Sequence, residues 1–289
     1  MPETENQPEY ASDPLEIDTK YRQLLERIRR AKSAAIAFSG GVDSSFLCYA
    51  AHEALGEKAA AFTVVSPMLS KAERGDAASV AAHIGISHYL IEEETIDDEV
   101  AANSRDRCYF CKKIEFGAIK KAAAERGFAV VFDGSNLDDE GDYRPGLAAL
   151  AEIGIVSPLR EAGFRKDEIR AISRRALLPT WDKPAFACLA SRIPYGERVD
   201  AEKLGRIEKA EEILREKGFR QFRIRFHTGI ARIEVSPQER TRFFDTALLD
   251  EVSARIKACG FLYVAFELEG YRMGNMNRAL DIKTTGGKV

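Results

Sequence analysis

Apolar residues in the first half of the chain gather in short runs that alternate with amphipathic stretches. Four runs have the length and content of buried strands: residues 34–38, 59–65, 87–91 and 128–132. Helices are expected where apolar residues recur three and four positions apart: residues 21–32, 44–55, 71–83 and 112–126. Strands that alternate with helices predict an α/β fold, a Rossmann-like parallel sheet flanked by helices.

The last third of the chain has a different order of elements, which predicts a smaller α+β domain. Its expected elements are helices over 201–217 and 248–258 and strands over 221–227, 230–235 and 261–267. Before it, residues 178–197 are rich in proline, glycine and aromatic residues, which indicates a functional loop at a domain boundary. The expected divisions are a disordered tail over 1–18, an α/β domain over 19–196 and a domain for substrate binding or oligomerisation over 197–289.

The turn after the first apolar run is the most informative segment. Its sequence is Ser39-Gly40-Gly41-Val42-Asp43-Ser44-Ser45. The glycines carry no Cβ, so a ligand can approach the backbone closely. The first N–H groups of the following helix and the serine hydroxyls favour an anion such as phosphate. The loop lacks the lysine of a Walker A motif. Because Asp43 adds negative charge, we expect a bound polyphosphate to bring Mg²⁺ to it.

Polar residues after other apolar runs are expected to line the same crevice, because ligands of parallel sheets bind beyond the carboxyl ends of the strands. Thr63 and Ser66 follow the second run, and Gly134 follows the fourth. Asp142 and Arg144 lie a little further along, in an acidic segment whose alternative interpretation is a solvated turn. All five residues are therefore candidates for nucleotide binding.

Composition limits the class of protein. The chain has 289 residues, 45% of them apolar and 31% charged, which is typical of a globular protein with one large or two modest domains. A net charge of −3 gives no general attraction to nucleic acid, and no apolar stretch approaches the roughly 18 residues that span a bilayer. The acidic N-terminus lacks the pattern of a signal peptide. We therefore expect a cytoplasmic protein without a membrane or nucleic-acid partner.

Three of the five cysteines stand in unusual settings. Cys108 and Cys111 form a C-x-x-C, which alone fits a redox dithiol, half of a zinc site or a chance spacing. Cys188 lies far along the chain, where Lys183 and Arg192 could stabilise a thiolate. If the three thiolates meet, they can hold a cubane iron–sulfur cluster with one open iron. The other two cysteines are expected in the core: Cys48 and Cys259.

Basic and apolar residues alternate over 221–227. A strand sends its apolar residues to one face and Arg223, Arg225 and His227 to the other. Two guanidinium groups and an imidazole can form a fork for a phosphate. The alternative is a solvated outer face of a small sheet. On the next strand, Glu234 is a candidate metal ligand.

Four segments in this order resemble the LarE family of ATP-dependent sulfur transferases, which make the nickel-pincer nucleotide and belong to the PP-loop ATP pyrophosphatase superfamily. The segments are 39–45, 138–146, 181–196 and 223–234. The resemblance implies an adenine nucleotide alpha hydrolase-like fold. It also implies ATP and Mg²⁺ as ligands and pyridinium-3,5-biscarboxylic acid mononucleotide as substrate. One carboxylate would be adenylated, with release of pyrophosphate, and converted to a thiocarboxylate for the cofactor of lactate racemase and related enzymes.

The resemblance also assigns roles to residues. Cys188 is the sulfur donor in the simplest members, where it is consumed. With Cys108 and Cys111 the chain resembles a three-cysteine branch, in which a [4Fe–4S] cluster carries the donor sulfur and Cys188 is a ligand. We favour the cluster and keep the sacrificial cysteine open. Ser191 and Arg192 are expected to orient the substrate.

Substrate phosphate is expected at Arg223 and Arg225, and the family implies a homohexamer. A sulfur donor protein is a further candidate partner. Two other functions remain open. A tRNA thiolase of the same superfamily should carry a basic surface or an RNA-binding module, which the charge and the sequence do not indicate. A nucleotide sensor would keep the fold and lack the chemistry. A glutamine-dependent amidotransferase would need a glutaminase domain, and none is recognised here.

Overall fold

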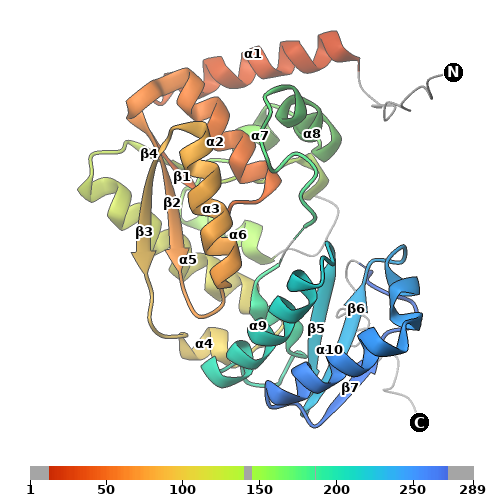
Figure 1. Ribbon diagram of the computed structural model, residues 1–289. Coiled ribbons are helices and arrows are strands. Elements are labelled where there is room, and N and C mark those ends of the chain that lie inside the picture. Colours follow the sequence, from red (N-terminus) through yellow and green to blue (C-terminus); the bar gives the residue numbers. More distant parts are fainter. Residues whose placement is uncertain (1–12, 140–144, 186, 273–289) are drawn as a thin grey trace, which may run out of the picture. The chain divides into compact units, whose positions relative to one another are not determined.

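The computed structural model describes residues 13–139, 145–185 and 187–272 (Figure 1). Contacts divide the chain into two compact units. Unit 1 comprises the described residues of Met1–Ser66, Lys71–Glu94 and Cys108–Ala185. Unit 2 comprises those of Pro67–Ser70, Thr95–Arg107 and Phe186–Val289. The long part of unit 2 thus begins earlier than the boundary expected after residue 196, and two short segments from the first half of the chain join it.

Unit 1 is built on the expected parallel sheet. Its strands are β1 (Ala34–Ala37), β2 (Ala59–Val65), β3 (Ser87–Glu92) and β4 (Val130–Phe132). Their order is β3-β2-β1-β4, and every neighbouring pair is parallel. Because β1 is central and buried, the loop that follows it opens at the middle of the carboxyl edge of the sheet. The predicted α/β class is confirmed.

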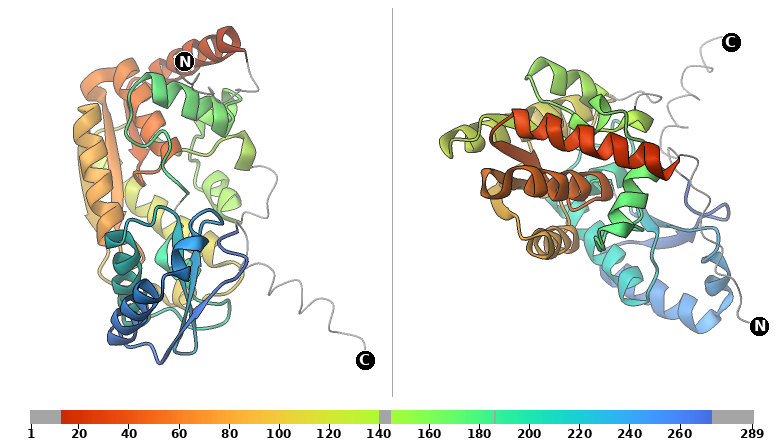
Figure 2. Two further views of the ribbon diagram at one scale, coloured as in Figure 1. Left: turned by 45° about the vertical axis from the view of Figure 1, so that its right-hand side comes forward. Right: turned by 90° about the horizontal axis from the view of Figure 1, so that it is seen from above.

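Helices cover both faces of this sheet, and the side chains of β1 alternate between them. Ala34 and Ile36 pack in a core with one set of helices, whereas Ala35 packs in a core on the opposite face. The first set is α1 (Pro14–Arg30), α2 (Val42–Leu55), α3 (Lys71–Ile84), α7 (Pro158–Glu161) and α8 (Lys166–Arg175). The opposite core contains residues of α5 (Arg107–Glu125) and α6 (Pro145–Glu152). Figure 2 shows α1 lying along α2.

Two features of unit 1 differ from the expectation. Helix α1 begins at Pro14, inside the segment assigned to the tail, because the Asp13 carboxylate accepts the N–H of Leu15 at 2.9 Å and caps the helix. The hydropathy pattern predicts no element at α6, α7 or α8. Of these, α8 matters most, because two of its side chains serve the phosphate loop.

Unit 2 is the expected α+β unit. A three-stranded sheet has the order β5-β6-β7, with β5 antiparallel and β7 parallel to β6. The strands are β5 (Phe222–His227), β6 (Ile230–Val235) and β7 (Tyr263–Phe266), and the helices are α4 (Asp98–Ala101), α9 (Ala201–Glu216) and α10 (Thr246–Ala258). The apolar residues of β5 pack in one core with residues of α9 and α10. Throughout the described residues, no helix is long and apolar enough to cross a bilayer.

Candidate active site

The phosphate loop is a turn at the start of α2 that is held by hydrogen bonds of its own serine side chains. The hydroxyls of Ser39 and Ser44 lie 3.1 Å apart, and the Ser44 hydroxyl lies 3.3 Å from the Gly41 carbonyl oxygen, to which it donates. Gly40 has a φ of +68°, and a Cβ there would lie 3.0 Å from the Cα of Ala77. Gly41 is the N-cap of α2 and has no side chain to occupy the first N–H groups. These groups therefore stand ready for an anion.

Gly134 lies just past the neighbouring strand β4 and packs directly on this loop. A Cβ at Gly134 would lie 3.1 Å from the backbone nitrogen of Ser44 and 3.3 Å from the carbonyl carbon of Asp43. The adjacent Asp133 is buried and accepts hydrogen bonds from the backbone N–H of Ser135 and the hydroxyl of Ser157. Gly134, which is predicted to bind nucleotide, is thus the residue at which the turn after β4 contacts the start of α2.

Thr63 plays a different role from the one expected. Its buried hydroxyl donates to the carbonyl oxygen of Phe38 at 2.7 Å and lies 2.8 Å from Nε2 of His88. Since a hydroxyl has one proton, the second contact makes His88 Nε2–H the donor. The Thr63 side chain is therefore committed to holding the residue before the loop. Ser66 is half-buried just past β2. Asp142 and Arg144 lie outside the described residues.

Only one of the two carboxylate oxygens of Asp43 has a hydrogen-bond partner in the described part of the chain. Its Oδ2 forms an ion pair with Nζ of Lys166, the first residue of α8. Its Oδ1 is buried without a hydrogen-bond partner among the described residues. Burial raises the pKa of the carboxyl above its ordinary value, against the opposing effect of the Lys166 charge. A buried carboxylate oxygen with no partner, beside an anion-binding loop, fits a Mg²⁺ ligand.

A second lysine also reaches the loop. Nζ of Lys183 donates to the carbonyl oxygen of Gly40 at 3.0 Å and pairs with Asp76 at 2.9 Å. Arg170 of α8 donates to the backbone carbonyls of Trp181 and Lys183 and so fastens this segment. The sequence suggested that Lys183 stabilises a thiolate. The structure instead gives its ammonium group partners at the phosphate loop.

The cysteines of the proposed cluster are described in separate units. Cys108 and Cys111 lie in the first turns of α5, three residues apart, and therefore point to the same side of the helix. Cys108 is exposed and Cys111 half-buried, whereas Cys188 is exposed in unit 2, just before a 3₁₀ turn over Leu189–Arg192. Among the described residues no three His, Cys, Asp or Glu side chains are grouped to hold a metal. Cys48 is buried as expected, and Cys259 is half-buried.

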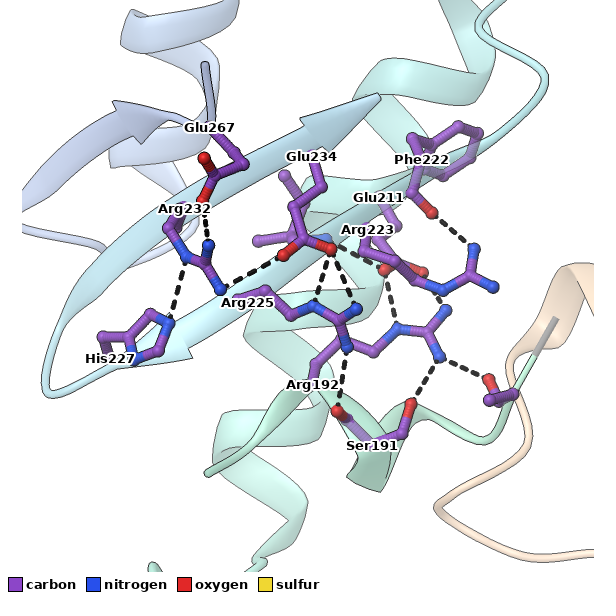
Figure 3. Close-up of polar contacts among 12 residues, drawn as sticks. Ser191, Arg192, Glu211, Phe222, Arg223, Arg225, His227, Arg232, Glu234 and Glu267 are labelled. Carbon is purple, nitrogen blue, oxygen red and sulfur yellow. Dashed lines mark hydrogen bonds and ion pairs between the residues drawn. The ribbon is translucent and has the colours of Figure 1, made fainter. Parts of the chain in front are cut away.

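Arg192 ties the turn after Cys188 to the α+β sheet (Figure 3). Its guanidinium group donates to Glu211 of α9 at 2.8 and 3.0 Å and to the carbonyl oxygen of Cys188 at 3.0 Å. Arg192 is 1% exposed. Burial alone would raise the pKa of Glu211, but the Arg192 charge holds it below its ordinary value. A side chain so enclosed holds the turn in place, and its expected role in orienting the substrate stays a prediction. Ser191 lies in the same turn.

Basic residues of β5 line one face of the sheet as predicted, but that face is not solvated (Figure 3). Arg223 is 2% exposed and Arg225 is 5% exposed. Burial and the nearby Arg192 lower the pKa of Arg223 to about 10. Arg225 pairs with Glu234 at 2.8 Å and donates to the carbonyl oxygen of Ser191 at 3.0 Å. The interpretation as a solvated outer face is therefore wrong.

Glu234 does not serve as the expected metal ligand in this arrangement. It is fully buried, with Oε2 on Arg225 and Oε1 on Arg232 at 3.1 Å. Arg232 also pairs with Glu267 and donates to Nε2 of His227, whose pKa is lowered by burial and by Arg232. Two guanidinium groups satisfy the carboxylate and would repel a cation.

The structure adds residues that the sequence analysis missed. Lys166 and Arg170 belong to α8, and its signals were available: Ile169 and Ile172 lie three positions apart, acidic residues open the segment and basic residues close it. Glu211 gave no signal, because a lone carboxylate in an amphipathic helix is ordinarily solvated.

Comparison with known proteins identifies the family. A sequence model described as asparagine synthase matches residues 21–135, which include the phosphate loop. An uncharacterized protein of Synechocystis sp. is 42% identical over 265 residues, covering 91% of this chain and 99% of its own. The pyridinium-3,5-bisthiocarboxylic acid mononucleotide synthase of Lactiplantibacillus plantarum is 35% identical over 269 residues, covering 91% and 96%. A tRNA-specific 2-thiouridylase of Pelobacter propionicus is 31% identical over 185 residues, covering 52% and 51%.

The parallel sheet and its phosphate loop define an enzyme of the PP-loop class, and the relatives make it an ATP-dependent sulfurtransferase. The chain belongs to the family of the pyridinium-3,5-bisthiocarboxylic acid mononucleotide synthase, since identity of 35% extends over nearly the whole of both chains. The resemblance seen in the sequence is thereby confirmed at the level of the family.

Proposed function

We propose that this enzyme adenylates a carboxylate of pyridinium-3,5-biscarboxylic acid mononucleotide and converts it to a thiocarboxylate during nickel-pincer cofactor synthesis. The carboxylate oxygen attacks the α-phosphorus of ATP, and pyrophosphate leaves. A sulfur nucleophile then attacks the acyl carbon, and AMP leaves with the former carboxylate oxygen. The name of the Lactiplantibacillus relative supports the product class, and the loop over Ser39–Ser45 supports the use of ATP.

The observation that carries this proposal is the unsatisfied carboxylate oxygen of Asp43 at an open anion-binding loop. Backbone N–H groups at the start of α2 would hold the departing pyrophosphate. Mg²⁺ on Asp43 would neutralise phosphate charge. Gly134 keeps the neighbouring turn close to the loop, because any larger residue would push on the backbone of Ser44. Ser66, Asp142 and Arg144 are proposed to contact the nucleotide.

Arg223 and Arg225 are proposed to bind the phosphate of the mononucleotide. With a pKa of about 10, Arg223 stays charged at neutral pH. The carboxylate of Glu234 holds Arg225 in place, so this arm of the fork is already ordered before substrate binds. Ala at either position should weaken substrate binding and leave ATP binding intact. Equal loss of both would contradict this role.

Sulfur is proposed to come through Cys108, Cys111 and Cys188. Exposed or half-exposed thiols, two of them on one side of α5, fit a cluster that keeps an open iron. When bound, a [4Fe–4S] cluster would supply hydrosulfide as the nucleophile. The alternative donor is Cys188 itself: its thiolate would attack the acyl carbon, and later Cβ–S cleavage would leave dehydroalanine. Loss of H₂S from the Cys188 peptide of cluster-loaded enzyme, found by mass spectrometry, would favour this alternative.

ATP–pyrophosphate exchange tests the first step. Labelled pyrophosphate should enter ATP only when the pyridinium mononucleotide is present. Exchange without it, or no exchange with it, would contradict the proposed substrate. A nucleotide sensor would bind ATP and give no exchange.

A tRNA thiolase is the second candidate, since such an enzyme matches about half of this chain. The net charge of −3 argues against it. Salt-sensitive copurification with tRNA would reverse this preference.

The unit that follows the Cys188 turn is proposed to serve substrate binding and assembly. A homohexamer is the expected state, and a separate protein is expected to reload sulfur. Light scattering on the purified enzyme tests the assembly.

A further inference from the structure

Two ammonium groups approach the phosphate loop from segments far along the chain. We infer that Lys166 and Lys183 bind the phosphates of ATP that leave as pyrophosphate. This inference rests on the proposed function, because it assumes that the loop holds a polyphosphate.

The loop itself cannot neutralise its ligand. Residues 39–45 contain no cationic side chain and one anionic one, Asp43. ATP adds several negative charges, and backbone N–H groups offset them only in part. A Walker A loop carries its own lysine for this purpose. Mg²⁺ on Asp43 would offset part of this charge, and cationic side chains that reach the loop from other segments of unit 1 can offset more.

Lys166 supplies one charge at the Asp43 end of the loop. Its Nζ lies on Oδ2 of Asp43, and its backbone N–H donates to Asp138 at 2.8 Å, which fixes the start of α8. The Lys166 side chain is 33% exposed, so its end can move although its Cα is anchored. When Mg²⁺ binds the carboxylate of Asp43, repulsion between the two cations would favour transfer of the ammonium group to a phosphate oxygen.

Lys183 supplies the second charge at the Gly40 end. Its ammonium donates to the Gly40 carbonyl at 3.0 Å and has Asp76 as its ionic partner at 2.9 Å. The carbonyl is neutral, and Asp76 is more than half exposed, so solvent weakens its attraction for the ammonium group. A phosphate in the loop would be a stronger partner than either.

Helix α8 begins with Lys166, fastens the segment of Lys183 through Arg170, and is itself held rigidly. Glu168 is fully buried, pairs with Lys20 at 2.8 Å and accepts the backbone N–H of Arg165 at 2.8 Å. Lys166 starts the helix, and Arg170, one turn on, holds the carbonyl of Lys183 at 2.9 Å. One rigid element thus sets two charges on opposite ends of the loop.

Calorimetric binding of pyrophosphate and of AMP, each with Mg²⁺, tests the inference on the full-length enzyme. Lys166→Met and Lys183→Met should each weaken pyrophosphate binding by about tenfold or more, the size expected for a charge-assisted hydrogen bond. AMP affinity should stay unchanged. Arg165→Met is the matched control: it removes one positive charge from the residue next to Lys166, whose exposed side chain pairs with Asp138. Pyrophosphate binding should not change in this control.

The outcomes separate this inference from the proposed function. Wild-type enzyme that binds neither ligand contradicts the proposed function. The inference alone is overturned if the wild-type enzyme binds both ligands and the two lysine variants bind pyrophosphate as tightly as the wild type. It is also overturned if Arg165→Met loses as much pyrophosphate affinity as the lysine variants. If Lys183→Met does not fold, Asp76→Asn replaces it. This change frees the ammonium group from its carboxylate and should tighten pyrophosphate binding; unchanged affinity would count against Lys183.

Discussion

Arg192 and Glu211 form a buried, two-pronged ion pair that joins the turn after Cys188 to helix α9, with N–O distances of 2.8 and 3.0 Å. The same carboxylate accepts the backbone N–H of Ile224 at 3.0 Å. One carboxylate therefore connects the turn, the helix and the edge strand β5. The position of Cys188 within unit 2 depends on this connection, because Arg192 also holds the Cys188 carbonyl.

Glu211→Gln should loosen the Cys188 turn. Removing one partner of a buried pair leaves an uncompensated charge, and we expect the free energy of unfolding of unit 2 to fall by about 3–5 kcal/mol. Iodoacetamide should label Cys188 faster, as followed by mass spectrometry. Glu212→Gln is the control, because the adjacent Glu212 pairs with Arg215 at the surface. If both variants label at the wild-type rate, the turn does not depend on the ion pair.

Gly134→Ala should weaken ATP binding without disturbing unit 2. The new Cβ would lie 3.1 Å from the Ser44 nitrogen, and a backbone contact can relax only by shifting the loop. We expect the free energy of unfolding of unit 1 to fall by about 1–3 kcal/mol. Gly117→Ala is the matched control, because its Cβ would meet no atom within 4 Å and a helical alanine is favoured. ATP affinities of the two variants, measured by calorimetry, should differ clearly.

Asp43→Asn should raise the Mg²⁺ concentration needed for half-maximal ATP–pyrophosphate exchange. An amide binds the cation more weakly than a carboxylate and leaves Lys166 without its ionic partner. Asp18→Asn, which removes an exposed partner of Arg175, should behave as wild type. An unchanged Mg²⁺ requirement in Asp43→Asn would place the cation elsewhere.

Because of His88, the free energy of unfolding of unit 1 should fall in mild acid. Burial lowers the pKa of His88 below its ordinary 6.5, so the folded protein keeps a neutral imidazole while the unfolded chain takes up a proton. The stabilising effect is therefore complete above pH 6.5 and is lost as the pH falls below it. In His88→Gln the free energy of unfolding, measured by urea denaturation, should depend less on pH between 7 and 5. An identical slope would contradict this.

Iron binding should require all three cysteines. Cys108→Ser, Cys111→Ser and Cys188→Ser should each lose most of the iron and sulfide found in anaerobically reconstituted wild-type enzyme, because a cubane held by two thiolates is poorly retained. Cys259→Ser is the control, since this half-buried thiol ends α10 and should not contribute. No iron in reconstituted wild type would return the donor role to Cys188 alone.

The order of strands and helices could be predicted from the sequence, because buried strands such as β1 and β2 are uninterrupted apolar runs. Alternation along β5 also predicted which residues share a face. It could not predict that Arg223 and Arg225 are buried, because burial depends on what covers the face. The carboxylate partner of Arg225 comes from the neighbouring strand, and pairing of that kind is set by register.

The apolar pattern of helix α8 is weak, because seven of its ten residues are charged or serine and only Ile169, Ala171 and Ile172 are apolar, so the signals in its terminal charges are easily overlooked. Its role in the candidate site was therefore invisible, although the loop that it serves was evident. Glycine, serine and aspartate in one turn form a local pattern, whereas a lysine that arrives from a distant helix leaves no mark near that turn. The hydrogen bond from the Thr63 hydroxyl to the Phe38 carbonyl likewise joins β2 to the residue that follows β1 and could not be predicted from the residues around Thr63.

The lysines lie 123 and 143 residues beyond their partners in the loop. On the ribosome, the glycine turn emerges early, and a nascent chain that has not reached residue 166 presents it without either counter-charge. Firm capture of nucleotide must therefore wait until translation has passed Lys183, so that the ligand and the last segment of unit 1 complete this unit together.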